Sequence, residues 1–358
     1  MKSKSPIVFF IDDLAPGGAQ KQLILLANQL SSILPNTIYI MCYGLNLRLQ
    51  EDLDISKIKL VFLRRKYKAS ILIFATWELW RIKPFIVISF LRSPNIIVEI
   101  VRFFILRKFK LIISERSAQN YLLKGPLLLL QRLLHRSQPD YIVFNSSHNM
   151  DLFATYYGLD NRLTVIENFV EVKIVEIPER RKVFNIGVFA NYTRNKNVQG
   201  LIAALLLLDP ETLERIHIDW YGEERDESYC LAKKDVETHN LSSVLRLNGF
   251  CPNPIEKYED LHCIASFSFF EGMSNSLLEA MAYKRVVIAS RIPSSVELLK
   301  SEDFLFDPEN PIEIADVLFR VSELSDNEVE KIALYNFDRI SDMHNSHDIL
   351  NKWLALIK

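Results

Sequence analysis

Apolar, β-branched and aromatic residues recur along this chain in short runs, and segments with helical spacing separate them. After the first run, residues 7–11, Leu23, Leu26, Ala27 and Leu30 recur at the i, i+3, i+4, i+7 spacing of one helix face. The strands predicted in the first half are residues 7–11, 37–42, 58–63, 85–90, 111–114 and 141–145. Strands that are apolar on both faces and alternate with helices indicate a parallel α/β sheet.

The same pattern starts again in the second half of the chain. Residues 165–182 contain Pro178 and a cluster of charges, which is typical of a linker. The second set of predicted strands is residues 184–190, 216–221, 244–250, 263–270 and 285–290. We therefore predict two Rossmann-like domains, residues 1–172 and 183–336, separated by a cleft. Ligands of such sheets bind at the carboxyl ends of the strands, so the chemistry is expected there.

Composition describes a globular protein, with 358 residues of which 49% are hydrophobic and 24% charged. The four cysteines form no CxxC pair and no secretory signal precedes them, so we expect a reducing cytoplasm. The longest apolar stretch, residues 84–106, is interrupted by Arg92, Glu99 and Arg102. It is therefore not expected to span a bilayer, and the protein is expected to be soluble or peripheral.

The net charge of −1 hides a marked asymmetry. Residues 1–180 carry 24 Lys and Arg against 15 Asp and Glu, whereas the remainder carries 19 against 29. Within the first half, residues 57–125 hold 15 basic and 3 acidic side chains. Such a basic face attracts phospholipid surfaces, nucleic acids or phosphorylated substrates. A solvated basic surface without a partner is the alternative.

Two segments of this basic domain have an amphipathic pattern. Residues 121–136 predict, after Pro126, a helix with leucines on one side and polar or basic side chains on the other: Gln131, Arg132, His135 and Arg136. Residues 103–110 are of similar type. They favour docking on an anionic bilayer, although ordinary core-facing helices have the same pattern.

Several familiar sites are excluded by the motifs that are missing. With ten glycines, the sequence has no G-x-G-x-x-G after a strand and no G-x-x-x-x-G-K-[ST], so dinucleotide and P-loop sites are not supported. His344 and His347, and the Asp12-Asp13 pair, lack further ligands at metal-binding spacing. No metal site is expected.

The stretch FFEGMSNSLLEAMA, residues 269–282, places Glu271 and Glu279 in a small and apolar setting. It follows a predicted strand and leads into an apolar helix, so Gly272 to Ser276 is expected to be a turn at a helix N-terminus, which suits a phosphate. Eight residues at a rise of ~1.5 Å separate the carboxylates by roughly 12 Å, about the distance from a sugar across a diphosphate to a ribose. The alternative is a capping box, with Ser276 at N-cap, Glu279 at N3 and Glu271 as an exposed loop residue.

Residues 249–298 resemble the retaining glycosyltransferases of family 4, which have the GT-B fold. The resemblance rests on two glutamates separated by seven residues, followed by an apolar strand, a Ser-containing turn and a Glu. Further segments that resemble the family are residues 16–30, 111–119, 165–170 and 192–205. The resemblance implies two Rossmann-like domains facing each other across a cleft, with a C-terminal helix, residues 337–358, that packs back on the first domain.

The resemblance also assigns roles to individual residues. It implies that Lys196 and Glu271 are catalytic, with the Lys196 ammonium on the donor diphosphate and Glu271 on the donor sugar, and that Glu279 holds the ribose. The full set of donor-binding residues that it implies is Gly17, Gly18, Asn191, Arg194, Lys196, Phe250, Cys251, Glu271, Gly272, Met273, Ser274, Asn275, Ser276, Leu277 and Glu279.

The chain departs from the family at several positions. Asn191 stands where the family usually has Arg, and Arg194 is the candidate replacement. On the acceptor side, Arg116 stands where relatives often have His, and Glu115 is the nearest carboxylate. Arg116 cannot act as a base. The resemblance implies that the departing phosphate helps to deprotonate the acceptor, so no dedicated protein base is expected. Lys196 and a helix N-terminus would replace a metal, so no metal or other cofactor is expected.

The function that this resemblance implies is transfer of a hexose or N-acetylhexosamine from a UDP-sugar to a glycan linked to undecaprenyl diphosphate. The product would be a bacterial surface polysaccharide: O-antigen, capsule or exopolysaccharide. The enzyme would lie peripherally on the inner face of the cytoplasmic membrane, held by its basic N-terminal domain, without nucleic acid. Two alternatives are a nucleotide-sugar epimerase, with His148, His217 and His262 as loosely placed candidates, and a non-catalytic module that binds anionic lipid or RNA.

Overall fold

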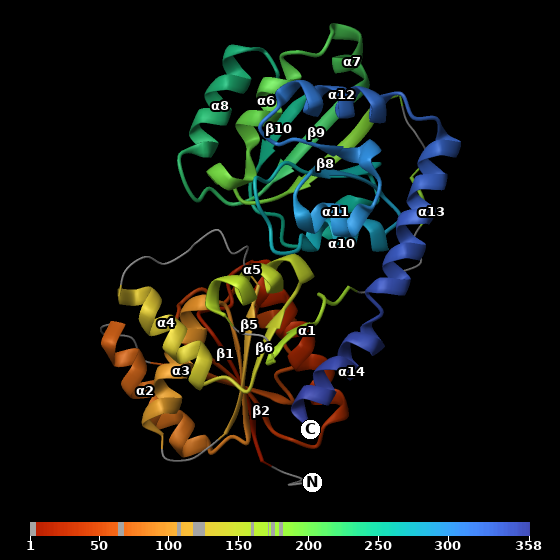
Figure 1. Cartoon of the computed structure of the whole chain (residues 1–358). Coiled ribbons are helices and arrows are strands. Elements are labelled where there is room, and N and C mark those ends of the chain that lie inside the picture. The colour runs from red at the N-terminus through yellow and green to blue at the C-terminus, as the bar shows by residue number, and fades with distance from the viewer. Residues whose placement is uncertain are drawn as a thin grey trace. The chain divides into compact units, whose positions relative to one another are not determined.

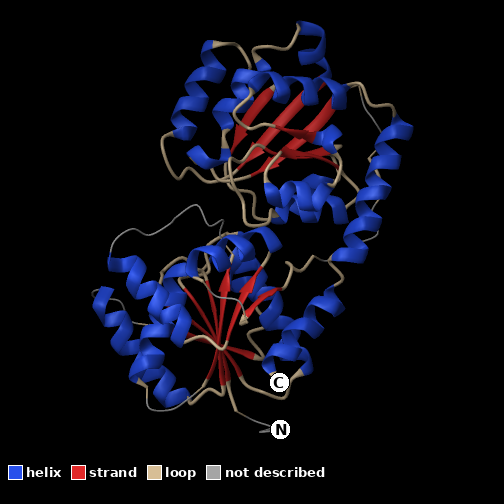
Figure 2. Cartoon of the chain, viewed as in Figure 1, coloured by secondary structure: helices blue, strands red, loops and turns tan. Residues whose placement is uncertain are grey.

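The computed structural model describes residues 5–63, 68–105, 109–116, 126–158, 161–170, 172, 176–178 and 182–358. The chain divides into two compact units (Figure 1). The first contains residues 1–169 together with 346–358, and the second contains residues 170–345. Each unit is built on its own parallel sheet with helices on both faces (Figure 2), which confirms the predicted pair of Rossmann-like domains.

The first unit contains a seven-stranded parallel sheet in the order β3-β2-β1-β4-β5-β6-β7. Its strands are β1 Ile7–Ile11, β2 Ile38–Cys42, β3 Ile58–Phe62, β4 Ile86–Phe90, β5 Lys110–Glu115, β6 Tyr141–Phe144 and β7 Leu163–Val165. Six of them match the predicted runs. The sequence reasoning missed β7, a three-residue edge strand too short to show a hydrophobic period.

Helices cover both faces of this sheet (Figure 1). One face packs against α1 Gly18–Ile33 and the C-terminal helix α14 Ser346–Ile357, whose buried side chains share one apolar cluster with the strands. The other face packs against α2 Lys68–Ile82, α3 Arg92–Phe104 and α5 Ser147–Tyr157, and α4 Pro126–Ser137 packs on α3. A short 3₁₀ turn, η1 Arg48–Asp52, precedes β3.

Helix α4 forms where a helix was predicted after Pro126. Leu129, Leu130 and Leu133 are 45–61% exposed, and Arg132 and Arg136 of the predicted polar side are also exposed. The other two residues of that side, Gln131 and His135, are buried, because the interior offers them polar partners. His135 Nδ1 lies 2.6 Å from Glu99 Oε1, and its Nε2 lies 2.9 Å from Gln131 Nε2. Residues 121–125 of that predicted segment, and 106–108 of the other, lie outside the described residues.

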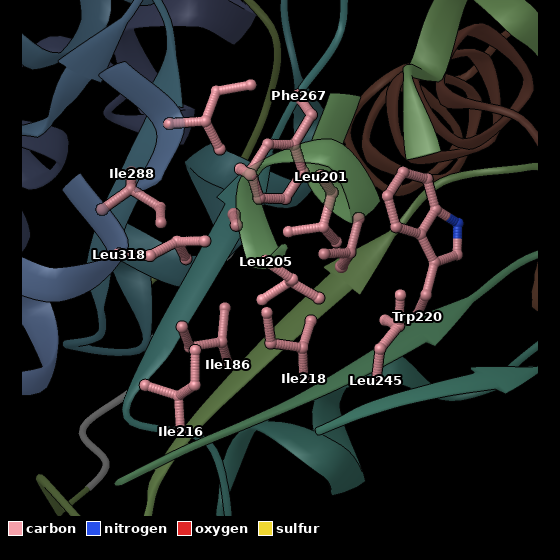
Figure 3. Packing of buried hydrophobic residues seen from close by; sticks show 14 of the residues in the cluster. Ile186, Leu201, Leu205, Ile216, Ile218, Trp220, Leu245, Phe267, Ile288 and Leu318 are labelled. Carbon is pink, nitrogen blue, oxygen red and sulfur yellow. The ribbon is translucent and has the colours of Figure 1, made fainter. Parts of the chain in front are cut away.

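The second unit contains a six-stranded parallel sheet in the order β10-β9-β8-β11-β12-β13. Its strands are β8 Phe184–Phe189, β9 Ile216–Tyr221, β10 Leu245–Asn248, β11 Cys263–Ser266, β12 Val286–Ser290 and β13 Leu305–Phe306. Its helical segments are η2 Arg194–Lys196, α6 Val198–Leu205, α7 Pro210–Arg215, α8 Ser228–Thr238, α9 Pro254–Tyr258, α10 Asn275–Ala282, α11 Pro293–Leu299, η3 Glu302–Phe304, α12 Pro311–Ser322 and α13 Asp326–Met343. The stacked rings of Trp220 and Phe267 lie in this core near the carboxyl ends of β9 and β11 (Figure 3).

The C-terminal boundary differs from the prediction. Residue 337 lies inside α13, an unbroken helix of the second unit that starts with a capping box between Ser325 and Glu328. Ile340 of that helix is fully buried in the cluster that contains α10. The chain therefore joins the first unit at residue 346, where α14 begins, and not at 337.

Candidate active site

The strand order of the second sheet reverses between the neighbouring strands β8 and β11. A parallel α/β sheet leaves a crevice at such a point, outside the carboxyl ends of the two strands. The loop after β8 contains η2 Arg194–Lys196, and the loop after β11 leads into α10. Both predicted catalytic residues therefore lie on loops that leave the sheet at its topological switch point.

The side chains of Lys196 and Glu271 meet there. The Lys196 ammonium forms an ion pair with Glu271 Oε1, and the two side chains are 25% and 17% exposed. Ser268 Oγ donates a hydrogen bond of 2.8 Å to the same carboxylate oxygen. The pair is thus partly screened from water but open on one side, where a ligand can exchange for either partner.

Asn195 joins the two loops. Its side-chain Nδ2 donates to the Phe270 carbonyl at 3.0 Å, its Oδ1 accepts from Phe270 N–H at 3.2 Å, and its backbone carbonyl accepts from Phe269 N–H at 2.9 Å. These bonds hold Lys196 opposite Glu271. Sequence reasoning missed Asn195 and Ser268; the only available signal was their position next to the two predicted catalytic residues.

The turn between β11 and α10 lies where it was predicted. The alternative, a capping box of Ser276 and Glu279, is not formed. Ser274 is the N-cap of α10, and its hydroxyl lies 3.1 Å from the Ser276 hydroxyl and makes no side-chain cap bond. Because the helix begins at Asn275, Glu279 is its fifth residue and not N3, so the capping-box interpretation is wrong. The first bond of this helix runs from Leu278 N–H to the Ser274 carbonyl at 3.2 Å, so earlier N–H groups are not used by the helix itself.

Glu279 is half-buried one turn into α10, facing α9. The pKa of the Tyr258 hydroxyl is well above its usual value, first because the ring is fully buried and then because the charge of Glu279 lies nearby. Phe250 and Cys251, the residues predicted beside the donor base, follow β10 directly and are half-buried. Phe250 and Cys251 thus lie beyond the carboxyl end of a strand of this sheet.

Asn191 and Arg194 lie on the loop after β8. Asn191 Oδ1 accepts a hydrogen bond of 3.0 Å from Glu223 N–H, so this side chain shapes the loop. The Arg194 backbone N–H donates to Asp226 at 2.9 Å, while its side chain is exposed. A second cation from Arg194 in place of Asn191 therefore stays a prediction.

The histidines considered for an epimerase lie elsewhere. His217 is the second residue of β9 and His262 immediately precedes β11, so both lie at the amino edge of the sheet. His262 Nδ1 accepts from Asn185 N–H at 2.9 Å and the ring stacks on Phe184, which is a structural role. His148 belongs to α5 of the first unit. Among the described residues, no group of three or more His, Cys, Asp or Glu is placed to hold a metal.

The predicted residues of the first unit are placed as follows. Gly17 is the N-cap of α1 and Gly18 its first residue, so both lie at the carboxyl end of β1. Their part in donor binding stays a prediction. Glu115 and Arg116, expected on the acceptor side, are only 5% and 8% exposed.

Arg116 is held inside the first unit by several groups. Its Nη1 donates to Asn168 at 2.7 Å, its Nε donates to Ser114 Oγ at 2.7 Å, and the guanidinium lies over the rings of Phe90 and Trp353. Burial lowers its pKa to about 9. Glu115 Oε1 likewise accepts from Asn95 at 2.8 Å. Both side chains therefore fix the end of β5, and their place on the acceptor side stays a prediction.

Residues 180–323, which include both loops of the site, match the family profile described as glycosyl transferases group 1. The matched residues lie within the second unit. The chain is also 28% identical over 222 residues to poly(ribitol-phosphate) alpha-N-acetylglucosaminyltransferase of Staphylococcus aureus (strain COL). That match covers 60% of this chain and 43% of the relative, so the chain spans less than half of the length of that protein.

Solved structures resemble the whole chain and not the matched segment alone. HepE of Anabaena, in complex with UDP and glucose, has a TM-score of 0.82 at 15% identity, covering 99% of both chains. A mutant of TarM from S. aureus, in complex with Fondaparinux, alpha-GlcNAc-glycerol and UDP, has a TM-score of 0.80 at 13% identity, covering 98% of this chain and 99% of that one. These similarities confirm the predicted GT-B fold.

Proposed function

We propose that this protein is a retaining, metal-independent glycosyltransferase of family 4 that transfers a hexose or N-acetylhexosamine from a UDP-sugar. One observation carries the proposal. Lys196 and Glu271 meet at the switch point of a glycosyltransferase domain, directly before the N-terminus of α10. A cation, a carboxylate and a helix N-terminus at one place suit a diphosphate joined to a sugar.

The chemistry follows from where charge develops. When the bond between the anomeric carbon and the diphosphate oxygen breaks, negative charge grows on the leaving diphosphate. The Lys196 ammonium and the α10 N-terminus stabilise that charge, and Glu271 accepts hydrogen bonds from sugar hydroxyls. The departing phosphate, and not a side chain, takes the proton of the acceptor hydroxyl, since Arg116 is no base and Glu115 is bound to Asn95.

The ion pair of Lys196 and Glu271 has a role in this scheme. Without a donor, each charge neutralises the other across the site. A donor offers a diphosphate to the ammonium and hydroxyls to the carboxylate. Lys196 and Glu271 then each bind the donor in place of each other. Glu279, one turn further along α10, is the group that would hold the ribose.

The nucleotide and the acceptor are proposed from relatives and from charge. HepE and TarM were crystallised with UDP, and the S. aureus relative is named for transfer of N-acetylglucosamine to poly(ribitol-phosphate). For this chain we propose an undecaprenyl-diphosphate-linked glycan of bacterial surface polysaccharide as the acceptor. The excess of Lys and Arg between residues 57 and 125 supports contact with an anionic membrane at its cytoplasmic face.

A panel of UDP-sugars with undecaprenyl-diphosphate-linked acceptors tests this function. We expect UDP release that requires the acceptor, a product whose anomeric configuration by NMR equals that of the donor, and no loss of rate in EDTA. Inhibition by EDTA that a divalent ion reverses would contradict metal independence. Conversion of a UDP-sugar to its epimer without acceptor would favour the epimerase, for which His217 and His262 lie at the wrong edge of the second sheet.

A further inference from the structure

The first unit has an unusual outer surface on its α2, α3 and α4 side. Eight large apolar side chains, each 45–71% exposed, lie on these three neighbouring helices. We call them the outer apolar face: Ile73, Trp77 and Trp80 of α2, Phe103 and Phe104 of α3, and Leu129, Leu130 and Leu133 of α4. The helices pack side by side on the same face of the sheet (Figure 1). Apolar patches of this extent on a surface mark interaction sites.

On helix α2, the exposed apolar side chains lie on the side opposite to the one that packs against the core. Ala75 and Leu79 on its inner side are buried, and Ile73, Trp77 and Trp80 repeat at i, i+4 and i+7 on its outer side. A helix that is apolar all round is normally covered on both sides. In α4, likewise, the polar Gln131 and His135 point inward while three leucines point outward.

A groove of about 770 Å³ runs along this surface where α2 meets the end of α3. Trp77, Trp80, Phe104 and Ile105 line it, and the only polar side chain in the lining is Thr76. The size is within the usual range for a bound small molecule, but the described residues that line the groove include no charged group to orient one. The groove therefore suits a hydrocarbon chain and not a sugar or a nucleotide.

The charged side chains around the outer apolar face indicate whether it binds a lipid surface or a second copy of this chain. The segment of residues 57–125 has three acidic side chains; Glu99 and Glu115 are buried and Glu78 pairs with Arg81. On the three helices of this face, the described charged side chains that are exposed are basic: Arg81 of α2, and Arg132 and Arg136 of α4. Two copies joined through this face would bring like charges together, which opposes association. An anionic bilayer is attracted by the same charges and accepts the apolar side chains.

We propose that the outer apolar face inserts into the interface of an anionic bilayer, with Trp77 and Trp80 at the level of the lipid headgroups and a lipid hydrocarbon chain in the α2–α3 groove. Tryptophan prefers this level because its ring is apolar and its N–H is polar. Among the described residues, no helix is both long and apolar enough to span the bilayer. The inference deepens the membrane contact proposed above, and vesicle binding tests it without donor or acceptor, so it can fail while transfer activity remains.

Co-sedimentation with vesicles of phosphatidylglycerol and phosphatidylethanolamine tests the proposal on the full chain. We expect binding to fall at least tenfold in Ile73→Ser and in the double variant Trp77→Ser/Trp80→Ser, with unchanged melting temperature. Ile312→Ser is the matched control, because Ile312 of the second unit is 70% exposed and Ile73 69%. Unchanged binding by both face variants, which would mean attraction by charge alone, overturns the proposal.

Tryptophan fluorescence gives an independent measurement. The chain has four tryptophans, of which Trp220 and Trp353 are fully buried, so vesicles change the emission through Trp77 and Trp80. We expect a blue shift with these vesicles and quenching by brominated lipid chains. No quenching overturns the insertion. A concentration-dependent dimer in light scattering that Ile73→Ser abolishes also overturns it, because a second copy would then be the occupant.

Discussion

Lys196→Ala is expected to lower kcat by about 10²–10³-fold, because it removes the cation on which the leaving diphosphate depends, a loss similar to that of one oxyanion-hole donor. The ammonium is already held at the site by Glu271 and by the Asn195 bonds between the two loops. The ammonium is therefore preorganised, and a mobile side chain is not expected to replace its positive charge. The measurement is steady-state UDP release with saturating donor and acceptor.

Lys233→Ala is the matched control for this variant. Lys233 is an exposed lysine of α8 in the same unit, and its removal is expected to leave kcat unchanged. If Lys196→Ala folds normally and turns over as fast as the control, the assignment of Lys196 to the leaving diphosphate is wrong. A partial rescue by Lys196→Arg would support a role for the charge itself.

His135→Ala is expected to destabilise the first unit by about 3–5 kcal/mol, because it leaves the buried Glu99 without its charged or hydrogen-bonded partner. Both side chains are fully buried and their closest atoms are 2.6 Å apart. Burial raises the pKa of Glu99, and the neighbouring His135 opposes that rise. At this domain size the loss corresponds to a fall in melting temperature of roughly 6–20 °C, measured by calorimetry.

Two comparisons separate the buried pair from a general loss of packing. His347→Ala, at a position 80% exposed on α14, is expected to change stability by less than about 0.5 kcal/mol. The double variant Glu99→Leu/His135→Ala is expected to be more stable than His135→Ala alone, because no carboxyl group is then buried without a partner. A double variant less stable than either single one would contradict the account.

The fold was predictable because the strands are buried on both faces and alternate with helices. The runs at residues 7–11 and 184–190 correspond to β1 and β8, the central strands from which each sheet is built outward. The paired glutamates and Lys196 were found through local patterns at strand ends. The two-residue β13 was not predicted, because so short an edge strand shows no hydrophobic period. Strand β11 ends at Ser266, whereas the prediction extended it to residue 270, because the aromatic loop of residues 267–270 has residue types that also form strands.

Long-range partners explain the other differences. Arg116 was expected on the acceptor side, and its burial was not predicted because it depends on Asn168 and on Trp353, 237 residues further along the chain. The burial of His135 on α4 depends on Glu99 of α3, because the buried carboxyl group is a partner for the ring. No local pattern contains such contacts. Asn195 was overlooked for the same reason, because its partner Phe270 lies 75 residues away.

The central claim is that the switch point of the second sheet binds the nucleotide diphosphate of a sugar donor. Calorimetric titration of UDP into the full chain tests it most directly. The account predicts saturable binding that weakens at least tenfold in both Lys196→Ala and Glu279→Gln, and that is unchanged in Glu330→Gln, an exposed position of α13. Equal UDP affinity in the parent and in both site variants, all correctly folded, would contradict it.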